Sequence, residues 1–254
     1  MMIMTPEEPT LEQVSDGVVV RQAIDNMGWA DMGGYTLIID ALEEPDLKEE
    51  VFRAVEETMP PQSVKVVLNT HVHYDHMALN AAFQDEFGAD IVNRDTEDIA
   101  PDGKTFKGTG RTCTMIPMPQ CHTGTDCLVW FPRDSVLFVG DLFGWGLIPS
   151  EATMRPEAQV RVTQIYKRLI RFNAKTVVPG HGPLCSTAEL KRWLDYFNDL
   201  RKQIKGLVDQ GVRGDELYER VPPPKDMQDW WRFVSWKHGD SVDKMRHAAE
   251  NGWL

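Results

Sequence analysis

The chain has 254 residues, enough to bury a substantial hydrophobic core as one large domain, or as one domain with a smaller extension. Its 39 acidic residues outnumber its 27 lysines and arginines, giving a net charge of −12 without any long basic stripe. Because phosphate contacts supply most of the affinity for nucleic acids, this charge argues against a nucleic-acid partner.

The N-terminal segment MMIMTPEEPTLEQ turns acidic early and does not build the apolar region of a secretory signal. No apolar run approaches the roughly 18 residues that span a bilayer. The four cysteines form no CxxC pair, which indicates reduced thiols. We therefore expect a cytoplasmic protein that acts on a small molecule and has no membrane partner; formation of a homodimer is left open.

In the first half of the chain, short β-rich runs alternate with helical stretches. Residues 35–41 and 64–70 are typical of buried strands, and residues 46–59 between them have helical spacing. Residues 78–88 follow as a predicted helix that ends at a glycine, and residues 89–94 as a further strand.

The second half continues this alternation. Residues 127–132 and 135–141 are predicted to form a hairpin around Pro132, Arg133 and Asp134. A helix over residues 156–172 and a strand over 175–180 complete the pattern, which predicts a mixed α/β fold.

The character of the sequence changes at Ser186. Ser186 and Glu189 have the spacing of a capping box, followed by a predicted amphipathic helix over residues 187–210. The remaining segment is helical and rich in tryptophan. We therefore predict a first domain over residues 1–186 and a helical C-terminal cap over residues 187–254.

The stretch NTHVHYDHMALN concentrates three of the seven histidines of the chain, together with an aspartate, within six positions. It directly follows the predicted strand 64–70, at a strand end where functional residues commonly gather. His71 and His73 are two positions apart on an extended segment, so they point to the same side and can share a metal. Asp75 and His76 are directed elsewhere and could serve a second ion.

Three more candidate ligands lie at or after the ends of other predicted elements. They are His122 in PMPQCHTGTD, Asp141 in FVGD and His181 in VVPGHG. Imidazole and carboxylate groups suit zinc, iron or manganese, and Asp141 is a carboxylate able to bridge two cations.

The ordered motifs TLIID, THVHYDH, CHT, FVGD and PGHG resemble those of the metallo-β-lactamase fold superfamily of metal-dependent hydrolases. The resemblance covers roughly residues 17 to 185, and the glyoxalase-II-like branch of the family also has a helical C-terminal region. It implies a four-layer αβ/βα sandwich with the metals at one edge and, here, a helical C-terminal extension.

The resemblance also implies a role for each candidate ligand. His71, His73 and His122 would bind a first divalent metal, Asp75, His76 and His181 a second, and Asp141 would bridge them. Asp40 would support the site from behind the ligands. Zinc is the expected metal, with iron or manganese as alternatives. Asp75 is also the candidate catalytic residue, which would orient or deprotonate a bridging water that attacks as hydroxide.

The family includes several reactions. We expect a binuclear hydrolase of a small ester, thioester or lactone. An iron-dependent persulfide dioxygenase on the same fold and a non-catalytic or redox di-metal protein remain the alternatives.

Residues outside the ligand set offer weaker signals. Trp145, in the glycine-containing segment 143–149, is expected to form a pocket wall, and Lys237 and His238 are candidates for binding a distal anion of the substrate. His238 also fits a structural role, as a lone histidine in a helical tail. The C-terminal aromatic residues indicate an apolar face that docks the cap near the metals and helps to define the pocket; these are Trp230, Trp231, Phe233 and Trp236.

Overall fold

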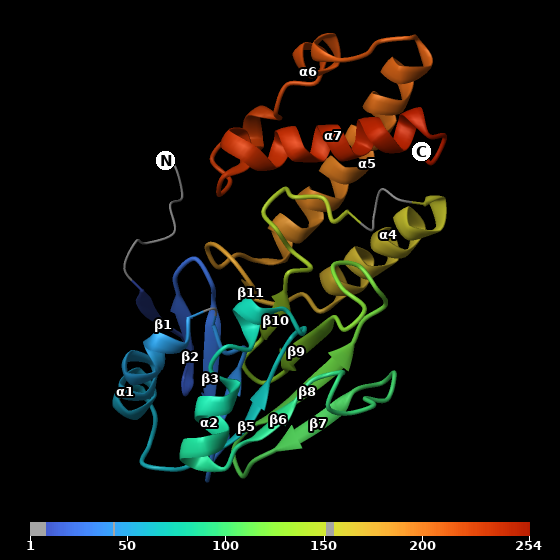
Figure 1. The fold of residues 1–254 in the computed structure, drawn as a ribbon. Coiled ribbons are helices and arrows are strands. Elements are labelled where there is room, and N and C mark those ends of the chain that lie inside the picture. The colour runs from blue at the N-terminus through green and yellow to red at the C-terminus, as the bar shows by residue number, and fades with distance from the viewer. Residues whose placement is uncertain (1–8, 43, 151–154) are drawn as a thin grey trace.

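Eleven strands form two sheets in the computed structural model, which describes residues 9–42, 44–150 and 155–254 (Figure 1). The first sheet has the order β1-β2-β3-β4-β5-β6 and the second has the order β11-β10-β9-β8-β7. The strands of the first sheet are β1 (Thr10–Ser15), β2 (Val18–Gln22), β3 (Met27–Asp31), β4 (Thr36–Ile39), β5 (Val64–Leu68) and β6 (Asp90–Val92). Those of the second are β7 (Lys104–Lys107), β8 (Thr112–Pro117), β9 (Cys127–Phe131), β10 (Val136–Gly140) and β11 (Thr176–Pro179).

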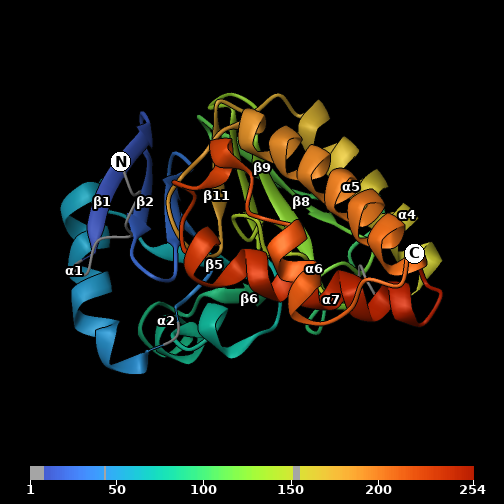
Figure 2. The same cartoon turned by 90° about the horizontal axis from the view of Figure 1, so that it is seen from above.

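Helices cover the outer faces of both sheets. On the first sheet these are α1 (Lys48–Thr58) and α2 (Asn80–Phe87); α4 (Pro156–Arg171) and α5 (Thr187–Asp209) lie on the second. Two further helices complete the C-terminal region, α6 (Asp215–Arg220) and α7 (His238–Glu250). Helix α5 contacts both α4 and α7, as the view from above shows (Figure 2).

Alternation along the strands explains the layers. Leu37 and Ile39 of β4 face the other sheet, whereas Ile38 between them faces the helices. In β10, Phe138 faces the first sheet and Leu137 faces α4 and α5. Because successive strand residues point to opposite faces, strands that are apolar throughout can bury both sides. The result is the predicted four-layer αβ/βα sandwich.

Most elements predicted from the sequence are present with slightly shorter bounds. Strands β4 and β5 are parallel and connected through α1, and β9 and β10 form the predicted antiparallel hairpin. Strands β1, β2, β3, β7 and β8 were not predicted.

The C-terminal region begins with the predicted capping box. Ser186 Oγ accepts a hydrogen bond from the backbone N–H of Ala188 at 3.1 Å, and the Glu189 carboxylate accepts one from the backbone N–H of Ser186 at 2.8 Å. One continuous hydrophobic cluster then joins the second sheet and α4 to α5 and α7. The predicted boundary near residue 186 therefore coincides with the start of a helix, while the core continues across it.

Within the described ranges, no helix combines the length and the apolar character needed to cross a membrane. Among the described residues, Cys113, Cys127 and Cys185 are free thiols, in line with the expectation of reduced cysteines. Residues 1–8, on which part of the expectation about a secretory signal rests, lie outside the described residues.

Candidate metal centre

The histidine cluster lies in the loop that leaves β5. After Leu68 the chain turns through residues 69–73 into a short 3₁₀ turn, Tyr74–His76. The buried Asn69 side chain fixes this turn by donating a hydrogen bond to the carbonyl of His76 at 2.8 Å, while the side chains of Asn69 and Asn80 bond to each other. Internal hydrogen bonds of this kind replace the backbone partners that a loop lacks.

Four side chains form a first cluster of potential metal ligands around the end of this loop. The Nε2 atom of His122 lies 3.0 Å from Nδ1 of His73 and 3.3 Å from a carboxylate oxygen of Asp141. The Nε2 atom of His71 lies 4.0 Å from the same oxygen of Asp141. One ligand atom from each residue falls within 4.8 Å of the others.

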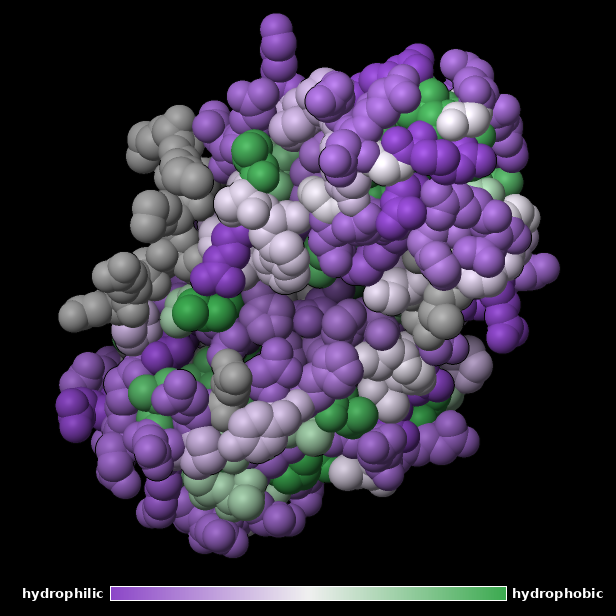
Figure 3. Space-filling model, turned by 45° about the horizontal axis from the view of Figure 1, so that its top comes forward, coloured by the Kyte–Doolittle hydropathy of each residue, from purple (hydrophilic) through white to green (hydrophobic). Residues whose placement is uncertain are grey.

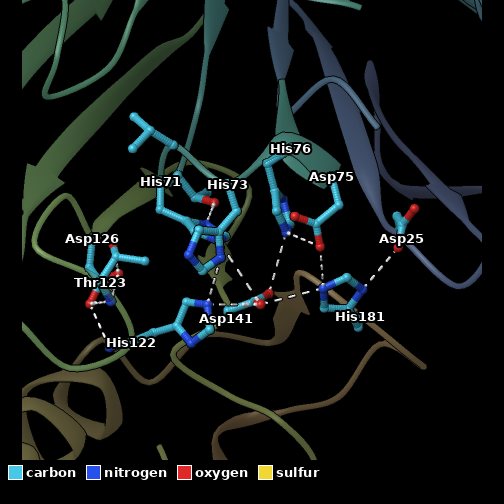
Figure 4. Close-up of polar contacts among 12 residues, drawn as sticks. Asp25, His71, His73, Asp75, His76, His122, Thr123, Asp126, Asp141 and His181 are labelled. Carbon is cyan, nitrogen blue, oxygen red and sulfur yellow. Dashed lines mark hydrogen bonds and ion pairs between the residues drawn. The ribbon is translucent and has the colours of Figure 1, made fainter. Parts of the chain in front are cut away.

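A second cluster shares Asp141. The Nε2 atom of His181 lies 3.1 Å from Asp75 Oδ2 and 3.4 Å from Asp141 Oδ2, and His76 Nε2 lies 3.4 Å from Asp141 Oδ1. Figure 4 shows the Asp141 carboxylate between the two sets of rings. All seven residues proposed from the sequence thus converge at one edge of the sandwich.

The donor atoms fit divalent cations. Among the described residues, His71 Nε2, His76 Nε2 and Asp141 Oδ1 are buried and have no hydrogen-bond partner. Buried polar atoms are normally satisfied, so the clustering of these atoms fits a site that binds a cation. Two groups of imidazole and carboxylate donors joined by one carboxylate match the ligand preferences of zinc, manganese or iron.

Burial and the carboxylates set the charge of this site. Burial lowers the pKa of His71 to about 2, and neighbouring His76 adds to the effect. For His76, burial also disfavours the charged form, but Asp40 and Asp141 outweigh it and raise the pKa to about 10. Burial opposes the ionisation of Asp141, whereas the nearby rings of His181 and His76 hold its pKa well below the usual range. The site therefore favours positive charge between its carboxylates.

Asp40, for which the family resemblance implies a supporting role, lies behind the second cluster. Its carboxylate is 3.1 Å from His76 Nδ1 and accepts hydrogen bonds from the backbone N–H and the hydroxyl of Thr70. Such a contact fixes which ring nitrogen of His76 faces the site.

Two further aspartates support the ligands and were missed by the sequence analysis. Asp25, between β2 and β3, lies 3.0 Å from His181 Nδ1 (Figure 4). Asp126 accepts hydrogen bonds from the backbone N–H groups of Cys121, His122 and Thr123 and so holds the His122 loop. The short CHTGTD turn offered a signal for Asp126, because aspartate commonly caps its own turn; Asp25 has no comparable sequence signal.

A pocket of about 250 Å³ opens beside the metal-ligand clusters. Figure 3 shows a hollow between the helical part of the molecule and the sheets, with hydrophilic residues inside it. Seven described residues at or near the clusters line the pocket: Ile24, Asp25, Asp75, His122, Asp141, Phe143 and His181. The others come from the loop after Asp141 and from the C-terminal cap: Gly144, Leu147, Trp231, Arg232, Trp236 and Lys237.

Trp145 and His238 are not in this lining, so the structure does not support the predicted contacts of these two residues with the substrate. Trp145 is 2% exposed, packs against Phe143 and Trp230, and donates its indole N–H to the Pro183 carbonyl at 3.1 Å. The neighbours Phe143, Gly144 and Leu147 line the pocket instead.

His238 fits the structural role left open by the sequence. It is buried, with one ring nitrogen 3.0 Å from the Tyr196 hydroxyl and the other 2.8 Å from the Val221 carbonyl. Both polar atoms therefore have partners within the cap.

Comparison with known proteins agrees with this geometry. The protein-family model described as "Metallo-beta-lactamase superfamily" matches residues 26–109 and 94–181 of this chain. These matches contain all seven candidate ligands.

The chain belongs to the metallo-beta-lactamase superfamily. The family resemblance predicted from the sequence is confirmed, and with it the assignment to a family of metal-dependent hydrolases.

Several curated proteins are similar in sequence. A hydroxyacylglutathione hydrolase of Rhizobium etli is 32% identical over 66% of this chain and 66% of its own length. One of Rhizobium johnstonii is 30% identical over 72% of this chain and 70% of its own. The alignments thus span about two thirds of these relatives. The 2,4-dinitroanisole O-demethylase subunit alpha of a Nocardioides species is 23% identical over 99% of this chain and 81% of its own.

Solved structures share the fold. A metallo-beta-lactamase from Pontibacter korlensis has a TM-score of 0.62 and 20% identity, covering 74% of this chain and 98% of its own. A sec-alkylsulfatase from a Pseudomonas species has a TM-score of 0.69 and 12% identity, covering 96% of this chain and 50% of its own.

Proposed function

We propose that the protein is a binuclear metallohydrolase that cleaves a small acyl substrate, with a thioester as the preferred class. The observation that carries this proposal is the pair of adjacent ligand clusters that share the Asp141 carboxylate. A site with two neighbouring cations is a common solution for hydrolysis at neutral pH, because no serine or cysteine nucleophile is needed.

In this proposal, His71, His73 and His122 would hold one zinc ion, Asp75, His76 and His181 would hold another, and Asp141 would serve both sites. The bound ions would supply Lewis acidity toward the substrate carbonyl and make a water molecule more acidic. Asp40 and Asp25 hold the rings of His76 and His181 in the orientation that this requires.

The protein groups around the ligands would position the substrate. The Asp75 carboxylate lines the pocket, where it can orient a water molecule and accept a proton from it. Phe143, Leu147 and Trp231 supply apolar surface that excludes water from the acyl group. A thiolate leaves readily, so thioester cleavage does not require a side-chain acid.

The preference for a thioester is supported by the hydroxyacylglutathione hydrolases among the relatives, whose name describes a thioester substrate class. Their alignments cover 66% and 72% of this chain, and the pocket lining also includes residues of the C-terminal cap. We therefore extend the reaction type to this chain, and not the identity of the acyl group or thiol.

Cleavage of an aromatic ether is a second candidate. It is favoured by the 2,4-dinitroanisole O-demethylase subunit, whose alignment spans 99% of this chain and so includes the cap. The aromatic residues Phe143, Trp231 and Trp236 in the pocket lining suit a flat apolar substrate.

The test is an activity panel with protein purified without added metal and then loaded with zinc, manganese or iron. The panel contains a hydroxyacylglutathione, short acyl N-acetylcysteamine thioesters, a lactone, 2,4-dinitroanisole and a persulfide. We expect metal-dependent thioester hydrolysis that is abolished in Asp141→Ala.

Each alternative has its own signature. Release of methanol from 2,4-dinitroanisole without thioester hydrolysis would favour the ether reaction. Oxygen consumption with the persulfide by iron-loaded protein would replace the hydrolase with the dioxygenase alternative. Stoichiometric metal with no turnover of any compound would support the non-catalytic alternative.

A further inference from the structure

Lys237 is a buried cation that faces the pocket. Its side chain is 2% exposed, and its Nζ atom has no hydrogen-bond partner among the described residues. It nevertheless belongs to the pocket lining. Buried ammonium groups are normally paired, since an unpaired charge away from water is costly.

An uncommon backbone turn presents this lysine. Residues Phe233–Lys237 form a single π-helical turn before α7, and Arg232 before it has a left-handed backbone with φ of 53°. Turns of this type are rare and often occur at functional sites, where they redirect a side chain.

Close packing holds the turn against the metal-binding loops. A Cβ atom at Gly182, next to ligand His181, would lie 2.6 Å from the Trp231 ring. A Cβ atom at Gly146 would lie 2.3 Å from the Phe233 ring. Because only glycine permits these approaches, the position of the segment is fixed relative to the metal centre.

The surroundings of Lys237 are cationic and aromatic. Its Nζ atom lies 3.9 Å from the centre of the Trp231 ring and 5.9 Å from that of Trp236. Burial lowers the pKa of Lys237 to about 7, and nearby Arg232 adds to this effect, while Asp141 opposes it. An aromatic ring partly compensates a cation but leaves its N–H donors without acceptors.

We propose that Lys237 binds a carboxylate of the substrate, and that the enzyme therefore selects acyl groups with a second acid function. This rests on the proposed function for the reaction itself. A substrate carboxylate would supply the acceptor that the Nζ atom lacks. The exposed Arg232 lines the same pocket and adds positive charge.

A matched pair of thioesters tests the proposal. S-succinyl-N-acetylcysteamine ends in a carboxylate, and S-(4-methylpentanoyl)-N-acetylcysteamine replaces it with an isopropyl group of similar shape. Zinc-loaded wild type should prefer the succinyl compound. Lys237→Met should lower kcat/KM for that compound about 10- to 100-fold, as expected for a lost charged hydrogen bond, and leave the other within about threefold.

Two variants serve as controls. Lys237→Arg keeps a cation and should retain part of the preference. Lys205→Met removes an exposed lysine of α5, which is paired with Asp209, and should leave both rates unchanged. Circular dichroism and zinc content identify any variant that does not fold.

Several results would overturn the proposal. These are a wild-type enzyme without preference for the succinyl compound, a Lys237→Met enzyme that keeps the preference, or an equal loss of kcat for both compounds. The last result, with a shifted pH profile, would make Lys237 a proton donor.

Calorimetric binding separates this proposal from the proposed reaction. Succinate and 4-methylpentanoate share one carboxylate that can reach the metals, and only succinate has a second. Wild type should bind succinate about tenfold tighter than Lys237→Met does, with 4-methylpentanoate unchanged. That result without thioester hydrolysis would sink the proposed function and keep the carboxylate site; hydrolysis without the binding difference would do the reverse.

Discussion

Asp25 Oδ1 lies 3.0 Å from His181 Nδ1. Asp25 belongs to the loop between β2 and β3 of the first sheet, and His181 follows β11, the last strand of the second sheet. One sheet therefore orients a candidate ligand that the other sheet provides. The neighbouring Asn26 reinforces the contact by donating hydrogen bonds to the carbonyls of Pro179 and Gly182, at 2.9 and 2.7 Å. The position of His181 therefore depends on how the two sheets meet.

Replacing Asp25 with alanine should weaken one of the two metal sites. Partners of this kind typically account for a 10- to 100-fold change in metal affinity. Titration of zinc against a competing chelator should show one weakened and one unchanged site. The exposed Asp209→Ala serves as a control; two unchanged sites in Asp25→Ala would rule out the supporting role.

Removing Asp141 should affect both clusters, because its two oxygens lie near rings of each. We expect Asp141→Ala to bind less metal at both sites and to lose activity, while its circular dichroism spectrum stays that of the folded protein. Elemental analysis after gel filtration measures the metal content. Near-normal turnover in this variant would show that Asp141 does not connect the sites.

The buried Arg111–Asp134 ion pair should dominate stability at the far side of the sandwich. Arg111 Nε lies 2.8 Å from the Asp134 carboxylate, with the side chains 5% and 2% exposed. Asp134→Ala leaves the arginine charge unpaired, which typically costs about 3–5 kcal/mol. Urea unfolding should show this loss of stability. Arg133→Ala, which removes the exposed arginine next to Asp134, should cause a much smaller loss.

The same pair predicts a pH dependence. Burial opposes ionisation of Asp134, but hydrogen bonds from Arg111 and Ser15 lower its pKa below the usual 3.8. The contribution of this ion pair to the free energy of unfolding is therefore fully present when the pH is above the ordinary pKa of an aspartate. It is lost as the pH falls through the lowered pKa of Asp134. The stability difference between wild type and Asp134→Ala should shrink in acid; a difference that grows there would contradict the assignment.

Replacing Lys237 should change stability in the opposite direction from Asp134→Ala. Because the pKa of its folded form is lowered from 10.5 to about 7, the unfolded chain binds more protons between these values. This group therefore makes the free energy of unfolding rise with pH from about 7 to 10.5. Lys237→Met should be more stable than wild type at pH 7, by up to a few kcal/mol, and lose this advantage near pH 10.5.

Urea unfolding of zinc-loaded protein at several pH values checks this expectation. The exposed Lys205→Met should show no pH-dependent difference from wild type. A Lys237→Met variant that is less stable than wild type at pH 7 would indicate that the ammonium group has a partner in the folded protein.

The sequence brought out these candidate ligands because each directly follows or ends a strand, or lies in a loop with compact spacing. His71, His73, Asp75 and His76 share one such loop, and His181 leaves β11 in the same way. Asp25 could not be found in this manner, because its role depends on contact with a residue far along the chain. Trp145 was misplaced because loop composition does not determine which way a ring packs.

The missed strands have a similar explanation. Strand β1 is largely exposed and β7 has the sequence KTFK, so neither contains an apolar run. Strand β3 contains Gly28, which disfavours a strand prediction. Gly28 is needed for packing between the sheets, because a Cβ atom at this position would lie 2.5 Å from the Phe138 ring of the opposite sheet.

The division of the ligands between the two halves of the sandwich has a thermodynamic consequence. The loop after β5 of the first sheet provides His71, His73, Asp75 and His76, and the second sheet's loops provide His122, Asp141 and His181. Neither half alone contains a complete cluster, so metal binding and the docking of the sheets are linked equilibria. At a thousandfold excess over its Kd, each ion would favour the docked sheets by about 4 kcal/mol, and a chelator would withdraw that stabilisation from the whole fold.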